Sequence, residues 1–198
     1  MNAKQNLYFT DSPKSTNMKK ILIGGLVGGI LLFAWQTISF AVANLHDKGQ
    51  QYTSKQDTIL QFLNNSGLEE GTYFMPRLQN ENSSEEMEKF MKEVDGKPWA
   101  QISYYKAWKM NMGMNMARGA LTNIIIVCLL AWIFSKMSTQ GLGTYFIASI
   151  FVGIICFANG PYTGHIWYPK HDINAYLMDA LVSWGLVGVW LGWWMRRK

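Results

Sequence analysis

Asp179 is the side chain in this sequence whose type and position most clearly indicate chemistry. It lies in an apolar stretch, residues 173–194, where an ionisable group is costly unless it has a partner or a function. Arg118 is its expected partner, because it opens another apolar stretch from the same side and its long side chain can reach the carboxylate. We expect an ion pair that fixes helix register, with proton or ion coupling and an exposed boundary carboxylate as alternatives. Asn123, in the same stretch as Arg118, is expected to add an interhelical hydrogen bond.

Methionines alternate with other residues just before the second apolar stretch, at Met110, Met112, Met114 and Met116. Soft thioethers can bind Cu(I), and an extended strand would place all of them on one face. In a helix, by contrast, positions i and i+2 face nearly opposite ways, and methionine is a common filler at adaptable interfaces. The helical interpretation is favoured, so copper handling is kept only as an alternative function.

The sequence carries no recognisable catalytic motif. It has no glycine-rich phosphate loop, nucleophile elbow or zinc-protease motif, and the spacing of His165 and His171 matches no standard metal site. Cys128 and Cys156 fall at different depths of predicted membrane helices, too far apart for a disulfide. We therefore expect a protein that is not an enzyme, with no cofactor and with free thiols.

These side chains must be positioned by membrane helices. A hydrocarbon core of about 30 Å needs roughly 20 mostly apolar residues in a helix, and four stretches approach this: 21–45, 119–134, 143–157 and 173–194. The predicted fold class is an all-α membrane protein, with a small helical extracytoplasmic insert between the first and second transmembrane helices. A signal peptide cleaved after Ala43 is the alternative for the first stretch, because Lys19 and Lys20 precede it and small residues follow it. Cleavage would leave three spans.

The formal net charge of +5 sets topology in this interpretation and does not indicate nucleic acid. The basic residues lie before the first stretch, between the second and third, and at the end of the chain: Lys19, Lys20, Lys136, Arg196, Arg197 and Lys198. If all four stretches cross, these places share one side, which is the positive-inside pattern. We expect a multi-pass protein of the bacterial inner membrane with both termini in the cytoplasm.

Four segments follow along the chain. Residues 1–17 are expected to form a disordered tail, 18–45 the first membrane helix, 46–116 the insert, and 117–198 the remaining membrane helices with short loops. Within the insert, apolar periodicity predicts a helix over 54–63, and Ser83 with Glu86 is a capping box that begins a second. A third helix is expected after Pro98, because aromatic and apolar residues recur at a spacing near three: Trp99, Ile102, Tyr105 and Trp108.

Glycines line the first and last membrane stretches, at Gly24, Gly25, Gly28 and Gly29 and at Gly185, Gly188 and Gly192. Small residues at such spacing let another helix approach closely in lipid. We expect these two helices to form a tightly packed pair or a contact between copies of the chain.

The end of the chain resembles a family of uncharacterised small bacterial proteins with four membrane helices. The resemblance is carried by Trp167-Tyr168, by Asn174 through Asp179, and by Gly188 through Trp194, with Phe33-Ala34-Trp35 in the first stretch also similar. The long insert, 47–115, departs from that family. The glycine-rich start after Met18-Lys19-Lys20, and the Gly96 to Trp99 segment, also resemble hypothetical proteins of the Bacteroidetes. The resemblance implies a fold and no biochemical activity.

The function predicted from sequence is that of an accessory or scaffold subunit, or a homo-oligomer, in the lipid bilayer. Its expected partner is another membrane protein or a second copy, and not nucleic acid. A proton- or cation-coupled small transporter using Asp179 is the alternative, followed by Cu(I) handling.

Overall fold

A computed structural model describes residues 18–79, 83–138 and 141–197. It contains four helices that are long and apolar enough to cross a membrane: Met18–Val42, Met112–Lys136, Leu142–Trp167 and Ile173–Trp194. The prediction of four membrane-spanning helices is confirmed in length and composition, with the last at its predicted bounds. The tail expected over residues 1–17 lies outside the described residues.

The chain divides into two compact units. One combines Met1–Gln51 with Asn111–Lys198, and we call its described part the bundle. The other, Tyr52–Met110, we call the inserted unit. The insert predicted over 46–116 is therefore longer than the unit that forms, because the chain around His46 belongs to the bundle and the methionines from Met112 onward are part of a membrane helix.

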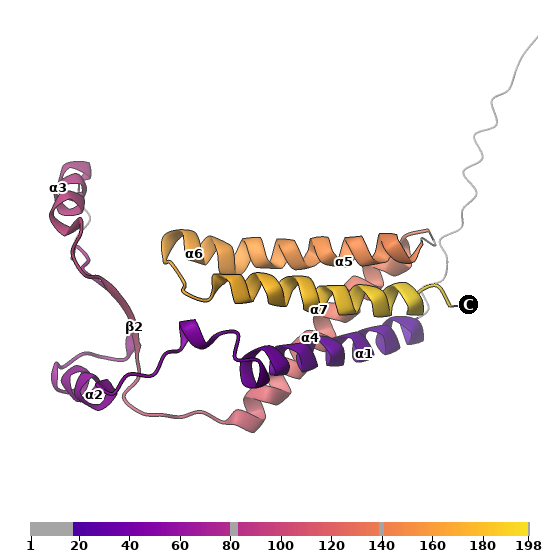
Figure 1. The fold of residues 1–198 in the computed structure, drawn as a ribbon, viewed down its shortest axis with the longest axis horizontal. Helices are drawn as coiled ribbons and strands as arrows, with labels where there is room; N and C mark the ends of the chain where they lie inside the picture. The colour runs from indigo at the N-terminus through magenta and orange to yellow at the C-terminus, as the bar shows by residue number, and fades with distance from the viewer. Residues whose placement is uncertain (1–17, 80–82, 139–140, 198) are drawn as a thin grey trace, which may run out of the picture. The chain divides into compact units, whose positions relative to one another are not determined.

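In the bundle, α1 packs on both α4 and α7, and α7 also packs on α5. In Figure 1, α4 crosses behind α1 and α7. α1 spans Met18–Thr37 and continues as a wider π-helical turn over Ile38–Val42; α4 spans Met112–Lys136, α5 Leu142–Phe157 and α7 Ile173–Trp194. The core that joins them is apolar: Ile21, Leu32, Val127, Leu130, Ala131, Phe134, Tyr145, Trp184, Val187 and Leu191.

The glycines of α1 lie at its contacts with two neighbouring helices, α4 and α7. A Cβ atom at Gly29 would lie 2.5 Å from the Cα of Ile124, and one at Gly25 would lie 2.9 Å from the Cα of Cys128, so α1 and α4 meet backbone to backbone. On the other side, the indole of Trp190 donates to the Gly24 carbonyl at 2.9 Å. The predicted close approach is present, and it lies within one chain.

Glycines of α7 face α5 and not α1. A Cβ at Gly188 would lie 3.0 Å from the Cα of Phe146, and one at Gly192 would lie 3.3 Å from the carbonyl oxygen of Leu142. Gly185 meets only ordinary van der Waals contacts. The α1 and α7 helices do pack together, but each glycine stripe is covered by its own set of neighbours.

The third membrane helix is longer than predicted. Helical structure continues from α5 through a π-helical segment, Ala158–Tyr162, into α6, Thr163–Trp167, so it extends past residue 157, the end of the predicted stretch, as far as Trp167. Pro161 lies inside this segment and cannot donate a backbone hydrogen bond. The Ala158 carbonyl accepts hydrogen bonds from both the backbone amide and the hydroxyl of Thr163, the latter at 2.7 Å.

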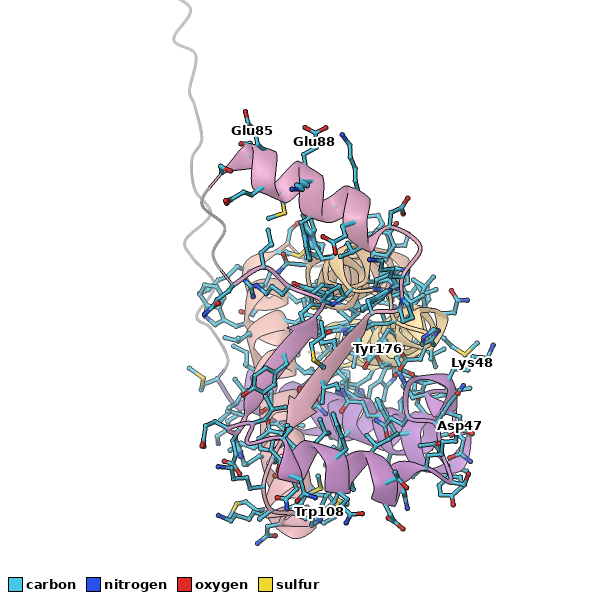
Figure 2. The ribbon with its side chains drawn as sticks, turned by 90° about the vertical axis from the view of Figure 1, so that its left-hand side faces the viewer. Asp47, Lys48, Glu85, Glu88, Trp108 and Tyr176 are labelled. Atoms are coloured by element: carbon cyan, nitrogen blue, oxygen red, sulfur yellow. The ribbon has the colours of Figure 1, made fainter. Side chains whose placement is uncertain are left out.

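The inserted unit contains two helices and a two-stranded antiparallel sheet. α2 spans Gln56–Asn65 and α3 spans Ser84–Val94, and both confirm predicted helices. Ser83 caps α3 by accepting a hydrogen bond from the Glu86 amide at 3.2 Å. Glu85 and Glu88 project from α3 (Figure 2).

The prediction of a third helix after Pro98 is wrong, because Ala100–Tyr104 forms a strand. β2, Ala100–Tyr104, pairs with β1, Gly71–Met75, in the register Gly71↔Tyr104. Gln101 and Ser103 are exposed, whereas Ile102 is half-buried and Tyr104 is buried. This alternation has the period of a strand, and the Tyr104 hydroxyl donates to the Asn64 side chain at 3.3 Å, which holds the strand against the end of α2.

Candidate functional site

The first membrane helix ends in a turn, in which the Leu45 amide donates to the Ser39 carbonyl at 2.9 Å. After the π-helical turn, Asn44 adopts a left-handed conformation with φ of 49°, which asparagine tolerates better than most residues. After this turn the His46 ring stacks on that of Phe40, with centroids 3.8 Å apart and planes 5° apart. His46 is therefore folded into the bundle although it follows the helix.

His46 lies between two carboxylates and is only 3% exposed. Its Nδ1 is 2.8 Å from Oδ2 of Asp172, and its Nε2 is 3.0 Å from Oδ2 of Asp179. Asp172 directly precedes α7 and Asp179 lies two turns along it, so the helical repeat of about 3.6 residues places both on one face. Tyr176 falls between them on that face and meets the His46 ring edge-on, with centroids 4.6 Å apart.

Neighbouring groups fix both carboxylates. The indole of Trp35 on α1 donates to Oδ1 of Asp179 at 3.0 Å, so this carboxylate bridges α1, α7 and the loop after α1. A Cβ at Gly49 would lie 2.6 Å from Oδ2 of Asp172, so only glycine allows this loop to approach so closely. We call Trp35, His46, Asp172 and Asp179 the histidine cluster.

The two contacts of the His46 ring with carboxylate oxygens need one more hydrogen than a neutral imidazole and two ionised aspartates supply. A neutral imidazole has one donor and one acceptor nitrogen, and ionised carboxylates only accept. Because both ring nitrogens of His46 contact carboxylate oxygens, either the ring is an imidazolium or one aspartate is protonated. In both cases one hydrogen lies in each of the two contacts between His46 and the carboxylates.

The expected partner of Asp179 is not the one found. Arg118 has an exposed side chain on α4, and among the described residues it forms no ion pair with Asp179. The reason lies in helix order: α4 packs on α1, whereas α7 packs between α1 and α5. Asn123, by contrast, donates to Oε1 of Gln36 at 2.7 Å, a hydrogen bond between α4 and α1.

The methionine segment does not form an extended strand over its last three members. Met112, Met114 and Met116 lie in the first turns of α4, where alternate residues face different directions, and Met110 belongs to the inserted unit. Within the part of the chain that the structure describes, no group of three or more His, Cys, Asp and Glu side chains is placed to hold a metal ion. In the histidine cluster each ring nitrogen already faces a carboxylate.

Of the four residues of the histidine cluster, only Asp179 was predicted as a site residue, and Trp35, His46 and Asp172 were not predicted as its partners. The aspartates and Tyr176 are spaced along one helical face, and this pattern is visible in the sequence. The position of His46 depends on the turn after α1, in which Asn44 has a positive φ. No local sequence pattern predicted this turn. Cys128 and Cys156 are both free; both thiols were expected to be packed, but Cys156 is exposed and only Cys128 is partly buried.

Comparison with known proteins gives no match to a family model, to a curated protein or to a solved structure.

Proposed function

We propose that the protein is a non-enzymatic subunit of the bacterial inner membrane that displays the inserted unit on the outer side, as an accessory or scaffold for another membrane protein. Both termini would then lie in the cytoplasm. The proposal follows the basic residues: Lys19 lies in the first turn of α1, Lys136 ends α4 and Arg197 follows α7. Successive spans alternate in direction, so these positions share one side, as the positive-inside rule requires.

The observation that carries a scaffold role is the exposed apolar surface of the inserted unit. Phe62 is 72% exposed, Tyr105 71% and Trp108 85%. Large apolar side chains that stay exposed mark a site for a partner where they form a contiguous patch. Aromatic anchors of this kind dominate the energetics of many protein interfaces, which supports a protein partner for this unit.

The histidine cluster has a structural role in this proposal. His46 precedes the inserted unit by a few residues, and its two carboxylate contacts tie the connecting loop to α7. These contacts hold the loop after α1 in a defined arrangement within the bundle.

Crosslinking in native membranes tests the scaffold proposal, followed by mild-detergent purification and mass determination of the full chain. We expect a stoichiometric membrane-protein partner that is lost in Phe62→Ser and Trp108→Ser but retained in Glu85→Ser, a matched change on the polar face of α3. A strictly monomeric particle, or a partner held equally by all variants, would contradict the proposal.

A second candidate function is proton coupling, and the extra proton of the histidine cluster favours it. Asp179 is within hydrogen-bond distance of both an imidazole and an indole, so protonation at this site would alter contacts among α1, α7 and the connecting loop. Ionisable residues at membrane depth commonly belong to proton relays. Since four helices seldom enclose a path alone, this function would require several copies.

Proteoliposomes loaded with a pH-sensitive dye distinguish the two functions. If Asp179 couples to protons, the wild-type protein dissipates an imposed pH gradient and Asp179→Asn does not. The control is Asp47→Asn, which changes an exposed carboxylate next to His46 in the sequence and should behave as wild type. Equal fluxes in wild type and Asp179→Asn, both correctly folded, would assign the carboxylate to structure.

A further inference from the structure

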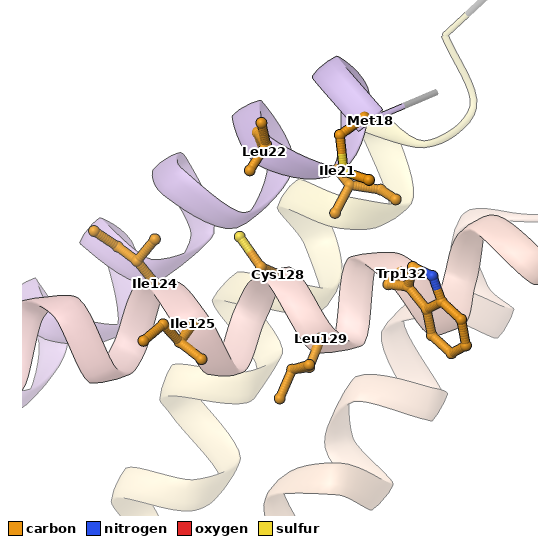
Figure 3. A pocket seen from close by; sticks show the side chains of 8 residues that line it. All are labelled: Met18, Ile21, Leu22, Ile124, Ile125, Cys128, Leu129 and Trp132. Atoms are coloured by element: carbon orange, nitrogen blue, oxygen red, sulfur yellow. The ribbon is translucent and has the colours of Figure 1, made fainter. Parts of the chain in front are cut away.

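An apolar groove runs between α1 and α4 at the end of the bundle where α1 begins (Figure 3). Its volume is about 640 Å³, within the range of about 300–1,000 Å³ typical of ligand sites. Met18, Ile21, Leu22, Ile124, Ile125, Cys128, Leu129 and Trp132 line it. From Ile124 to Trp132 the helical rise of about 1.5 Å per residue gives a length of roughly 12 Å, which suits part of an extended hydrocarbon chain.

Two lysines, Lys19 and Lys136, lie near one end of this groove. Lys136 lies one turn beyond Trp132 and places its Nζ 5.3 Å from the centroid of that indole ring. Lys19 is exposed and lies one turn before Leu22 on the same side of α1. Because α1 and α4 run in opposite directions, the start of α1 and the end of α4 meet at this end.

We propose that the groove is a binding site for an anionic phospholipid, with an acyl chain along α1 and α4 and the phosphate near Lys19 and Lys136. The apolar walls match the chain, and the lysines match the charge of the headgroup. Basic pockets between membrane helices are known sites for anionic headgroups. The exposed lysine side chains can extend along the helix ends to the level of the headgroups.

Charge favours a lipid over a second copy of the protein. A second copy seated here in the same orientation would bring Lys19 and Lys136 toward their own counterparts, and like charges repel. A lipid phosphate at the same place would be attracted to both lysines. The glycine-lined faces that commonly drive helix association are already buried inside the chain.

Native mass spectrometry of the full chain tests the site after delipidation and titration with phosphatidylglycerol or phosphatidylcholine in mild detergent. We expect one phosphatidylglycerol to be retained in preference to phosphatidylcholine. Each lysine near an anionic lipid surface accounts for roughly five-fold in affinity, so Lys19→Gln with Lys136→Gln should lower binding roughly 25-fold. Lys109→Gln, which removes a lysine of the inserted unit, is the matched control and should leave binding unchanged.

A second variant tests the acyl-chain part of the site. Ile125→Trp adds bulk at a groove residue that is 51% exposed, so the fold should tolerate it, and it should reduce lipid retention while the lysines are intact. Equal retention of the two lipids, or equal binding by the double lysine variant and Lys109→Gln, would overturn the proposal. A dimer that retains no lipid would also overturn it, since the groove would then be a contact between copies.

Discussion

At the scale of single residues, the histidine cluster shows how a polar group can be buried at the end of a membrane helix. His46 contributes two nitrogens and the aspartates contribute two oxygens, with one proton in each of the two contacts. The aromatic rings of Phe40 and Tyr176 cover the faces that these contacts leave. Since every partner comes from a different turn or loop, the cluster fixes tertiary structure and not a local helix.

Loss of the His46 ring should destabilise the bundle strongly. His46→Ala leaves two carboxylates close together without their cation or donor, and breaking a buried pair in this way typically costs about 3–5 kcal/mol. Thermal unfolding in detergent should show a clear fall in Tm, whereas His171→Ala, an exposed histidine next to Asp172, should change little. Equal melting of the two variants would show that the cluster does not stabilise the fold.

Lys106 provides a second prediction at this scale, outside the membrane helices. Its Nζ donates to Glu69 at 2.7 Å, and that hydrogen bond is the main cause that raises the pKa of Lys106 above its ordinary value of 10.5. A raised pKa means that the pair stabilises the fold below pH 10.5, and that this contribution is lost as the pH rises through the higher folded value.

NMR of ¹³Cε-labelled lysine in the full chain checks this directly. The Lys106 signal should titrate at higher pH in the wild-type protein than in Glu69→Gln, where the hydrogen-bonded carboxylate is absent. Identical titration midpoints in the two proteins would mean that the contact does not form in solution.

At the scale of elements, the sequence predicted the membrane helices well because their signal is long and redundant. The bounds of α7 were predicted correctly, and α2 and α3 were found from apolar periodicity and a capping box. β2 was missed because aromatic spacing near three suggested a helix, while the alternation of polar and apolar residues over 101–104 is only a few residues long. The extension through Pro161 was missed because proline and glycine there resemble a loop.

The glycine contacts of α1 give a prediction at this scale. Gly29→Ala should lower Tm, because the added Cβ meets the Ile124 backbone at 2.5 Å and overpacking of this kind typically costs about 1–3 kcal/mol. Gly143→Ala on α5 is the matched control, since nothing lies within 4 Å of a Cβ there and alanine favours a helix more than glycine. If the control loses as much stability as Gly29→Ala, close packing of α1 on α4 is not the cause.

At the scale of the whole molecule, the order in which the helices pack determines which side chains pair with Asp179, and the sequence did not predict that order. Predicting Arg118 as the partner of Asp179 requires α4 and α7 to be neighbours, and no local pattern reports which helices pack together. α1 instead packs on both of them and supplies Trp35, while the loop after α1 supplies His46. Pairing of ionisable residues across a bundle therefore depends on topology more than on depth in the membrane.

The central claim is that four helices cross the membrane and display the inserted unit on the side opposite both termini. Side-specific labelling tests it most directly, in a chain with Cys128→Ala and Cys156→Ala and one new cysteine at Ser84, in the inserted unit, or at Ser138, after α4. The account predicts that a membrane-impermeant maleimide labels Ser84→Cys in intact cells and labels Ser138→Cys only after permeabilisation. Labelling of both positions in intact cells, or the reverse pattern, would contradict it.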